Sequence, residues 1–207
     1  VGEAVDVLVV EAADHHAERS GGDPVLTEER DELRRSREFL HLMREDVLSL
    51  RALGGDPVSE EYLKAALYHR AEALTDLPDT PLFFGRLDYA REPGGEFAGE
   101  QFHIGRRHVH DPDGHPVVID WRAPVSRPFY RASPAEPMGL AHRRRFGFSG
   151  GELTAFEDED FTRPAAPGAG AGAVSQILLN EIERPRSGPM RDIVSTIQPD
   201  QDDIVRA

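Results

Sequence analysis

The sequence contains no cysteine, a single lysine and no long apolar run. Without cysteine there is neither a disulfide nor a thiolate metal site, which fits a reducing compartment. The longest apolar run near the start, Val7 to Val10, is too short for a signal-peptide core or a membrane span. We therefore expect a soluble, cytoplasmic protein with no membrane partner.

The formal net charge is -14, and the acidity is concentrated at the front of the chain. Residues 1–80 carry 19 Asp and Glu against 9 Lys and Arg, whereas residues 81–156 carry 9 against 10. An acidic front repels phosphates, so it favours a basic protein surface or a cation-containing channel over duplex DNA. A solvated acidic helix surface is the alternative interpretation.

A heptad pattern predicts a long helix over Leu26 to Leu50. Four apolar residues fall seven apart, and three further seam positions follow the last three of them by three residues: Leu26, Leu33, Leu40, Val47; Ser36, Met43, Leu50. We expect Thr27 to cap this helix and residues 1–19 to pack against it, with the turn at Ser20 to Pro24 making an antiparallel hairpin. Ser59 is expected to cap a third helix, which places Leu63, Leu67, Ala71 and Leu74 on one stripe.

Beyond residue 81 the pattern changes to short apolar or alternating runs separated by turns. The expected strands are Leu82 to Tyr89, Gln101 to Val109, Val117 to Trp121, Arg143 to Phe148 and Leu153 to Phe156. The turn Asp111 to Gly114 is expected to join the second and third strands. The predicted fold class is α+β: a coiled-coil-like helical hairpin, a small antiparallel sheet or partial barrel, and C-terminal helices. The predicted domains are residues 1–80, 81–163, a linker over 164–173, and helices over 174–207.

Two constellations in the strand region invite functional readings. His103, His108, His110 and His115, with Asp111 and Asp113, suggest a metal, but the first two histidines lie an odd number of residues apart on a strand and face opposite ways. Arg143, Arg144 and Arg145, followed by Phe146 and Phe148, suggest a nucleic-acid surface. Structural roles are favoured for both, since residues 157–160 are acidic and can neutralise the arginines. We therefore predict no resident metal.

Three stretches together resemble the HelD family, the helicase-like factors of bacterial RNA polymerase that are related to UvrD-type superfamily 1 helicases. They are Phe84-Gly85-Arg86-Leu87-Asp88 with His103-Ile104-Gly105-Arg106; Val118-Ile119-Asp120-Trp121-Arg122-Ala123-Pro124-Val125 through Ala132; and Met190 to Gln198 followed by Asp200-Gln201-Asp202-Asp203-Ile204. The resemblance implies a parent ATP hydrolase that uses ATP and Mg²⁺. In it Gln201 is the adenine-recognition glutamine, whose amide both donates and accepts.

The resemblance also implies that an acidic hairpin enters the secondary channel of core RNA polymerase and helps to release nucleic acid. The carboxylates expected to contact the partner are Asp14, Glu18, Asp23, Glu28 and Glu29. No Gly-rich phosphate loop with Lys-Ser or Lys-Thr is present, so we expect no catalytic residue in this chain, which reads as ending before the ATPase domain. The alternatives are an acidic coiled-coil adaptor for another protein, and a nucleic-acid-binding module that uses the arginines.

Overall fold

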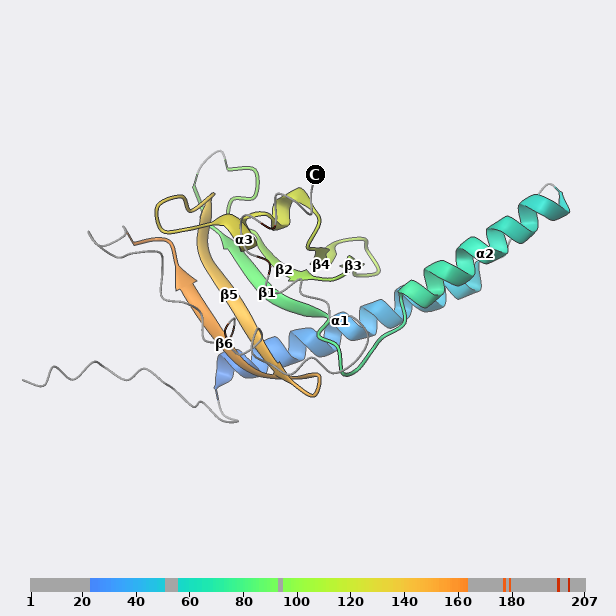
Figure 1. Ribbon diagram of the computed structural model, residues 1–207, viewed down its shortest axis with the longest axis horizontal. Helices are drawn as coiled ribbons and strands as arrows, with labels where there is room; N and C mark the ends of the chain where they lie inside the picture. The colour runs from blue at the N-terminus through green and yellow to red at the C-terminus, as the bar shows by residue number, and fades with distance from the viewer. Residues whose placement is uncertain are drawn as a thin grey trace, which may run out of the picture.

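The computed structural model of the chain describes residues 23–50, 56–92 and 95–163, together with residues 177, 179, 197 and 201. It contains two long helices and one six-stranded sheet (Figure 1). The helices are α1 (Pro24–Ser49) and α2 (Pro57–Ala73). A short 3₁₀ helix η1 (Pro124–Ser126) and helix α3 (Pro128–Arg131) follow β4. The α+β fold class predicted from the sequence is therefore confirmed.

Both long helices begin at an Asp-Pro pair. Asp23 caps α1 by accepting a hydrogen bond from Val25 N at 2.9 Å, and Asp56 caps α2 by accepting from Val58 N and Ser59 N. Proline fits the first helical position because its missing N–H would have no partner there. The predicted caps, Thr27 and Ser59, were each three or four residues too late.

The sheet has the strand order β3-β4-β2-β1-β5-β6. Its strands are β1 (Phe83–Tyr89), β2 (Gln101–Gly105), β3 (Val109–His110), β4 (Pro116–Asp120), β5 (Leu140–Ser149) and β6 (Glu152–Asp160). The turn at Asp111 to Gly114 joins β3 to β4 as expected, since Gly114 N donates to Asp111 O at 3.0 Å. Two predictions were wrong: the Gln101 to Val109 strand is split into β2 and β3, and β2 pairs with β4 in parallel. The sheet is consequently mixed and open, with β3 and β6 at its ends, and is not a barrel.

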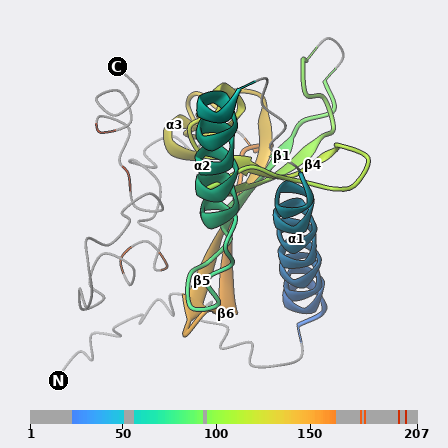
Figure 2. The same ribbon diagram turned by 90° about the vertical axis from the view of Figure 1, so that its right-hand side faces the viewer.

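Helix α1 covers one face of the sheet, and η1 with α3 covers the other (Figure 2). The first core combines Leu26, Leu33 and Leu40 of α1 with Phe83 and Phe146 of the sheet, all buried. The second core lies under η1 and α3 and includes Phe84, Leu87, Ile104, Trp121 and Phe129, with Ile197 from the C-terminal part. Each face of the sheet therefore has its own apolar cover.

Helix α1 crosses the whole sheet and then continues beside α2. Arg30 Nε donates to Leu153 O of β6 at 2.9 Å, and further along the helix Met43 contacts His110 N of β3 at 3.5 Å. One residue later Arg44 Nε donates to Ala71 O of α2 at 3.2 Å. We call α2 together with residues 44–49 of α1 the arm; its two helices run antiparallel and project past β3 (Figure 1).

The hairpin predicted between residues 1–19 and α1 lies outside the described residues, as do most of the predicted linker and C-terminal helices. Among the described residues, the seam of α1 packs on the sheet as far as Met43, and the last part of the helix packs on α2. The stripe predicted for the third helix is confirmed at its C-terminal end, where Ala71 and Leu74 are buried.

Candidate functional site

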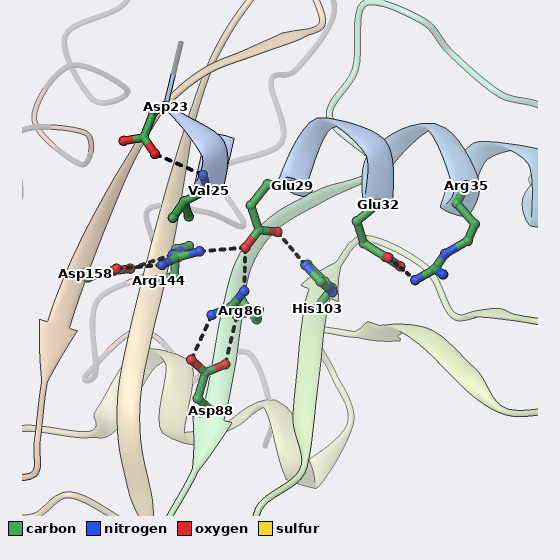
Figure 3. A network of polar contacts seen from close by, with 10 residues as sticks. All are labelled: Asp23, Val25, Glu29, Glu32, Arg35, Arg86, Asp88, His103, Arg144 and Asp158. Carbon is green, nitrogen blue, oxygen red and sulfur yellow. Dashed lines mark hydrogen bonds and ion pairs between the residues drawn. The ribbon is translucent and has the colours of Figure 1, made fainter. Parts of the chain in front are cut away.

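The most extensive polar cluster of the described structure surrounds Glu29, where α1 crosses the centre of the sheet (Figure 3). Oε1 of Glu29 accepts from Arg86 Nη1 of β1 at 2.5 Å and from Arg144 Nη1 of β5 at 2.7 Å. Its Oε2 lies 2.9 Å from His103 Nε2 of β2. One helix and three adjacent strands therefore meet at a single carboxylate.

Each of the two arginines also forms an ion pair with a second carboxylate. Asp88 holds Arg86 through two bonds of 2.8 and 2.9 Å, and Asp158 of β6 holds Arg144 through two bonds of 2.6 Å (Figure 3). Two-pronged pairing of this kind fixes the plane of a guanidinium group as well as its position. Asp88 and Asp158 thus fix the orientation of the two guanidinium groups that Glu29 contacts.

The Glu29 side chain is only 3% exposed. Burial alone would raise the pKa of its carboxyl, but the hydrogen bond and charge of His103, with Arg86 and Arg144, outweigh burial and lower the pKa below its ordinary value. Burial would likewise lower the pKa of Arg144, but the carboxylates of Asp158 and Glu29 raise it. The Glu29 carboxylate is therefore ionised near neutral pH, and it joins α1 to the sheet.

This placement corrects the expectation that Glu29 faces a partner, because both of its oxygens are used inside the fold. Asp23 is also buried, at 7% exposure, where its side chain caps α1. Glu28 is exposed, and Asp14 and Glu18 lie outside the described residues. The start of α1 lies on the sheet, so the described carboxylates of the predicted site are at the base of the helix and not on the arm.

The arginine run of β5 is engaged within the protein and does not present three side chains on one face. Arg144 points toward α1, whereas Arg143 lies on the opposite face, donates to Phe129 O and Ala132 O at the end of α3, and pairs with Glu159 at 2.5 Å. The register pairs Arg143 with Glu159 and Arg144 with Asp158 across β5 and β6. The neutralisation expected from residues 157–160 is confirmed, which weakens the nucleic-acid interpretation.

The Asp120 to Pro124 stretch builds the turn that leads from β4 into η1. The Asp120 side chain accepts from Arg122 N at 2.8 Å, and its carbonyl accepts from Ala123 N and Ser126 Oγ at 2.9 Å. The Arg122 guanidinium lies 5.0 Å from the centre of the Trp121 ring. Gly85 belongs to the same assembly, since a β-carbon there would lie 2.0 Å from Phe129 Cε2. The Asp120 to Pro124 stretch and Gly85 therefore shape the second core.

The histidines do not gather into a metal centre within the described residues. His103 binds Glu29, and His110 Nδ1 lies 2.7 Å from Asp111 O. Ligand atoms of Asp111, Asp113 and His115 do lie within 4.8 Å of one another in the β3–β4 turn. However, Asp111 accepts from the backbone N–H groups of Asp113 and His115 at 2.9 and 2.8 Å, so its carboxylate is explained by the turn.

The arm carries an exposed apolar surface that was not predicted from the sequence. Five of the nine exposed large hydrophobic residues in the described structure lie on the arm: Leu48, Val58, Tyr62, Leu63, Tyr68. The second Asp-Pro pair, at residues 56–57, was the available signal, because it marks the start of a helix that can pair with α1.

Gln201 is helical and exposed. No helix among the described residues is both long and apolar enough to cross a membrane.

A family model described as DNA helicase IV HelD, N-terminal domain, matches residues 25–171. The match includes α1, the arm and all six strands. No curated protein matches the chain.

Proposed function

This chain belongs to the family of HelD N-terminal domains, and from that premise we propose that it docks a helicase-like ATPase on bacterial core RNA polymerase. In this proposal the arm enters the secondary channel of the polymerase, and the parent protein uses ATP and Mg²⁺ to help release nucleic acid. Gln201 would help to orient the adenine in that parent.

The observation that carries the proposal is the arm itself. At about 1.5 Å per residue, α1 is roughly 39 Å long, and its contacts with the sheet run from Arg30 at β6 to Met43 at β3. The remainder is paired with α2, and the two helices project past β3 (Figure 1). A stiff two-helix projection is the shape required to reach into a channel.

The charge of the arm supports the same proposal. Residues 44–49 and 57–73 contain five carboxylates, Glu45, Asp46, Glu60, Glu61 and Glu72, against the three cations Arg44, Lys64 and Arg70. Asp56 adds another carboxylate at the cap of α2. Carboxylates suit a channel that contains Mg²⁺ and basic side chains, and they repel the phosphates of a nucleic acid.

The joint at Glu29 supplies the rigidity that such a projection needs. An arm that reaches a distant site must keep a fixed direction relative to the domain that carries it. Glu29 joins α1 to β1, β2 and β5 through side-chain hydrogen bonds, while Leu33 and Leu40 pack the same helix on the sheet. The buried carboxylate thus acts on the partner indirectly, through the angle at which the arm leaves the sheet.

The experiment is a binding titration of the purified chain with purified core polymerase at several salt concentrations. One variant neutralises three exposed carboxylates of the arm, and a matched control neutralises three exposed carboxylates elsewhere: Glu45→Gln, Asp46→Asn, Glu61→Gln; Glu28→Gln, Glu38→Gln, Glu96→Gln. We expect the arm variant to bind more weakly and with a smaller dependence on salt than the control.

The two variants also separate the proposal from a general acidic adaptor. Equal loss of polymerase binding in both would mean that overall charge, and not the arm, attracts the polymerase. An absence of binding by the unmodified chain would refute the polymerase proposal and leave an adaptor for another protein. Tight binding to single-stranded DNA that falls steeply with salt would favour the nucleic-acid-binding alternative.

A further inference from the structure

Helix α2 carries an apolar inner stripe and, on the opposite side, an outer stripe made of two large hydrophobic residues, an alanine and a histidine. The inner stripe, Leu67, Ala71 and Leu74, packs against α1 and the first core. The outer stripe consists of Val58, Tyr62, Ala65 and His69, which are separated by four, three and four residues and therefore share one helical face. All four are exposed, Val58 at 67% and Tyr62 at 77%. An ordinary surface helix has one apolar side and one polar side.

The outer stripe is exposed, and its position suits contact with another molecule. Single exposed hydrophobic residues are normal on a protein surface, but a row of them on one face marks an interaction site. Tyr68, at 62% exposure, lies next to the stripe, and its ring meets that of His69 edge-on at 5.8 Å. Tyrosine contributes large, stiff contact area at low entropic cost, and interfaces are enriched in it.

The charges beside the stripe indicate which partner fits it. Glu61 and Glu72 lie along one side, four residues before and seven after Ala65. Neither is within ion-pair distance of a basic group among the described residues, whereas Lys64 pairs with Glu60 at 2.6 Å. Two carboxylates without a salt bridge beside an apolar row match a groove with an apolar floor and a Lys- or Arg-bearing rim. Phosphate groups would be repelled.

We propose that the outer stripe of α2 is the face of the arm that seats on core RNA polymerase, in an apolar groove with a basic rim. This inference rests on the proposed function and adds to it the side of the arm that makes contact. Tyr62 lies at the centre of the stripe and supplies the main anchor. Glu61 and Glu72 align the arm with the rim and increase the rate of association.

The first test compares Tyr62→Ser with Leu77→Ser. Leu77 is 52% exposed in the loop after α2, so the control removes a similar apolar side chain outside the stripe. We expect Tyr62→Ser to raise the Kd for core polymerase by about tenfold or more, as for an interface anchor, and Leu77→Ser to leave it nearly unchanged. Melting temperatures should match in all three proteins, since neither side chain is buried.

The second test identifies the occupant by placing a photo-cross-linking amino acid, benzoylphenylalanine, at position 62 or at position 77 of the full chain. Cross-links from position 62, but not from 77, to a polymerase subunit in the purified complex support the inference. Cross-links from position 62 to a second copy of the chain, or to another part of the same chain, overturn it.

The two tests keep the inference distinct from the proposal on which it rests. If the chain binds polymerase and Tyr62→Ser binds equally well, the outer stripe is not the contact face, while the polymerase proposal stands. If the unmodified chain does not bind polymerase at all, both fail.

Discussion

Replacing Glu29 by Gln tests whether the joint between α1 and the sheet depends on a buried charge. The glutamine keeps the shape of the side chain but removes its charge, and its amide nitrogen must face a donor from Arg86, Arg144 or His103. Net contributions of hydrogen bonds to charged groups are about 1.5–3 kcal/mol each. Breaking a buried ion pair costs about 3–5 kcal/mol.

The two arginines limit that loss, because each keeps a second carboxylate. Arg86 remains bound by Asp88 and Arg144 by Asp158, so neither is left uncompensated. We therefore expect Glu29→Gln to lower the free energy of unfolding by about 3 kcal/mol, at the lower end of the range for a broken buried pair. For a chain of this size that is a fall in melting temperature of about 6–12 °C.

The assay is urea or thermal unfolding followed by circular dichroism at pH 7, with Glu28→Gln as the control. Glu28 is adjacent in sequence and exposed, so its neutralisation should change the unfolding free energy by less than about 0.5 kcal/mol. The reasoning is refuted if the two variants are equally stable. It is also refuted if Glu29→Gln keeps full stability but loses polymerase binding, because that result would require a partner-facing carboxylate.

Three further changes test the remaining parts of the structure. Leu40→Ala should destabilise the protein by about 2–5 kcal/mol in urea unfolding, because Leu40 is fully buried between α1 and the first core; a loss below about 1 kcal/mol would contradict that packing. Gly85→Ala should be less stable than the unmodified chain, because its methyl group overlaps the Phe129 ring; Phe129→Leu in the same protein should restore part of the loss, and no coupling between the two changes would argue against this contact. Finally, because the folded-state pKa of Glu29 lies below its ordinary value of 4.5, the stabilisation from Glu29 is present above pH 4.5 and is lost as the pH falls through the folded-state pKa. The stability difference between Glu29→Gln and the unmodified chain should therefore shrink as the pH is lowered from 4.5, and a constant difference would contradict the pKa direction.

Local patterns in the sequence located most elements of the fold. The heptad repeat of α1 predicted the buried positions Leu26, Leu33, Leu40 and Val47, whereas the last seam residue, Leu50, is exposed. Alternating apolar runs located β1, β4, β5 and β6 to within a few residues. Patterns of this kind depend on one element at a time. The parallel pairing of β2 with β4 depends instead on where the chain returns after β3, which no local pattern encodes.

The partner of a helix is not encoded in its own apolar seam. The seam of α1 fits equally well against another helix or against a sheet, and in the structure most of its length packs on the sheet and its last part on α2. Glu29 gave one usable sign: it occupies the position three residues after Leu26, where Ser36, Met43 and Leu50 complete the later repeats. A charged residue at a seam position is buried only when it is paired, and this predicts a joint and not a partner-facing carboxylate.

The outer stripe of α2 was hidden for a similar reason. Val58, Tyr62, Ala65 and His69 have the spacing of a core stripe, and so do Leu67, Ala71 and Leu74. Periodicity alone does not say which of two stripes faces the fold. Only the placement of α2 beside α1 separates the buried stripe from the exposed one.

The most direct test of the central claim is to locate the arm on the polymerase by hydroxyl-radical cleavage. Because the chain has no cysteine, Leu48→Cys on the arm and Glu28→Cys at the base each provide one attachment point for iron-EDTA, and both positions are exposed. We expect iron at residue 48 to cut the polymerase subunits that line the secondary channel, and iron at residue 28 to leave those sites intact. Cuts in the channel from residue 28 alone, or from neither position in a stable complex, would contradict the claim that the arm enters it.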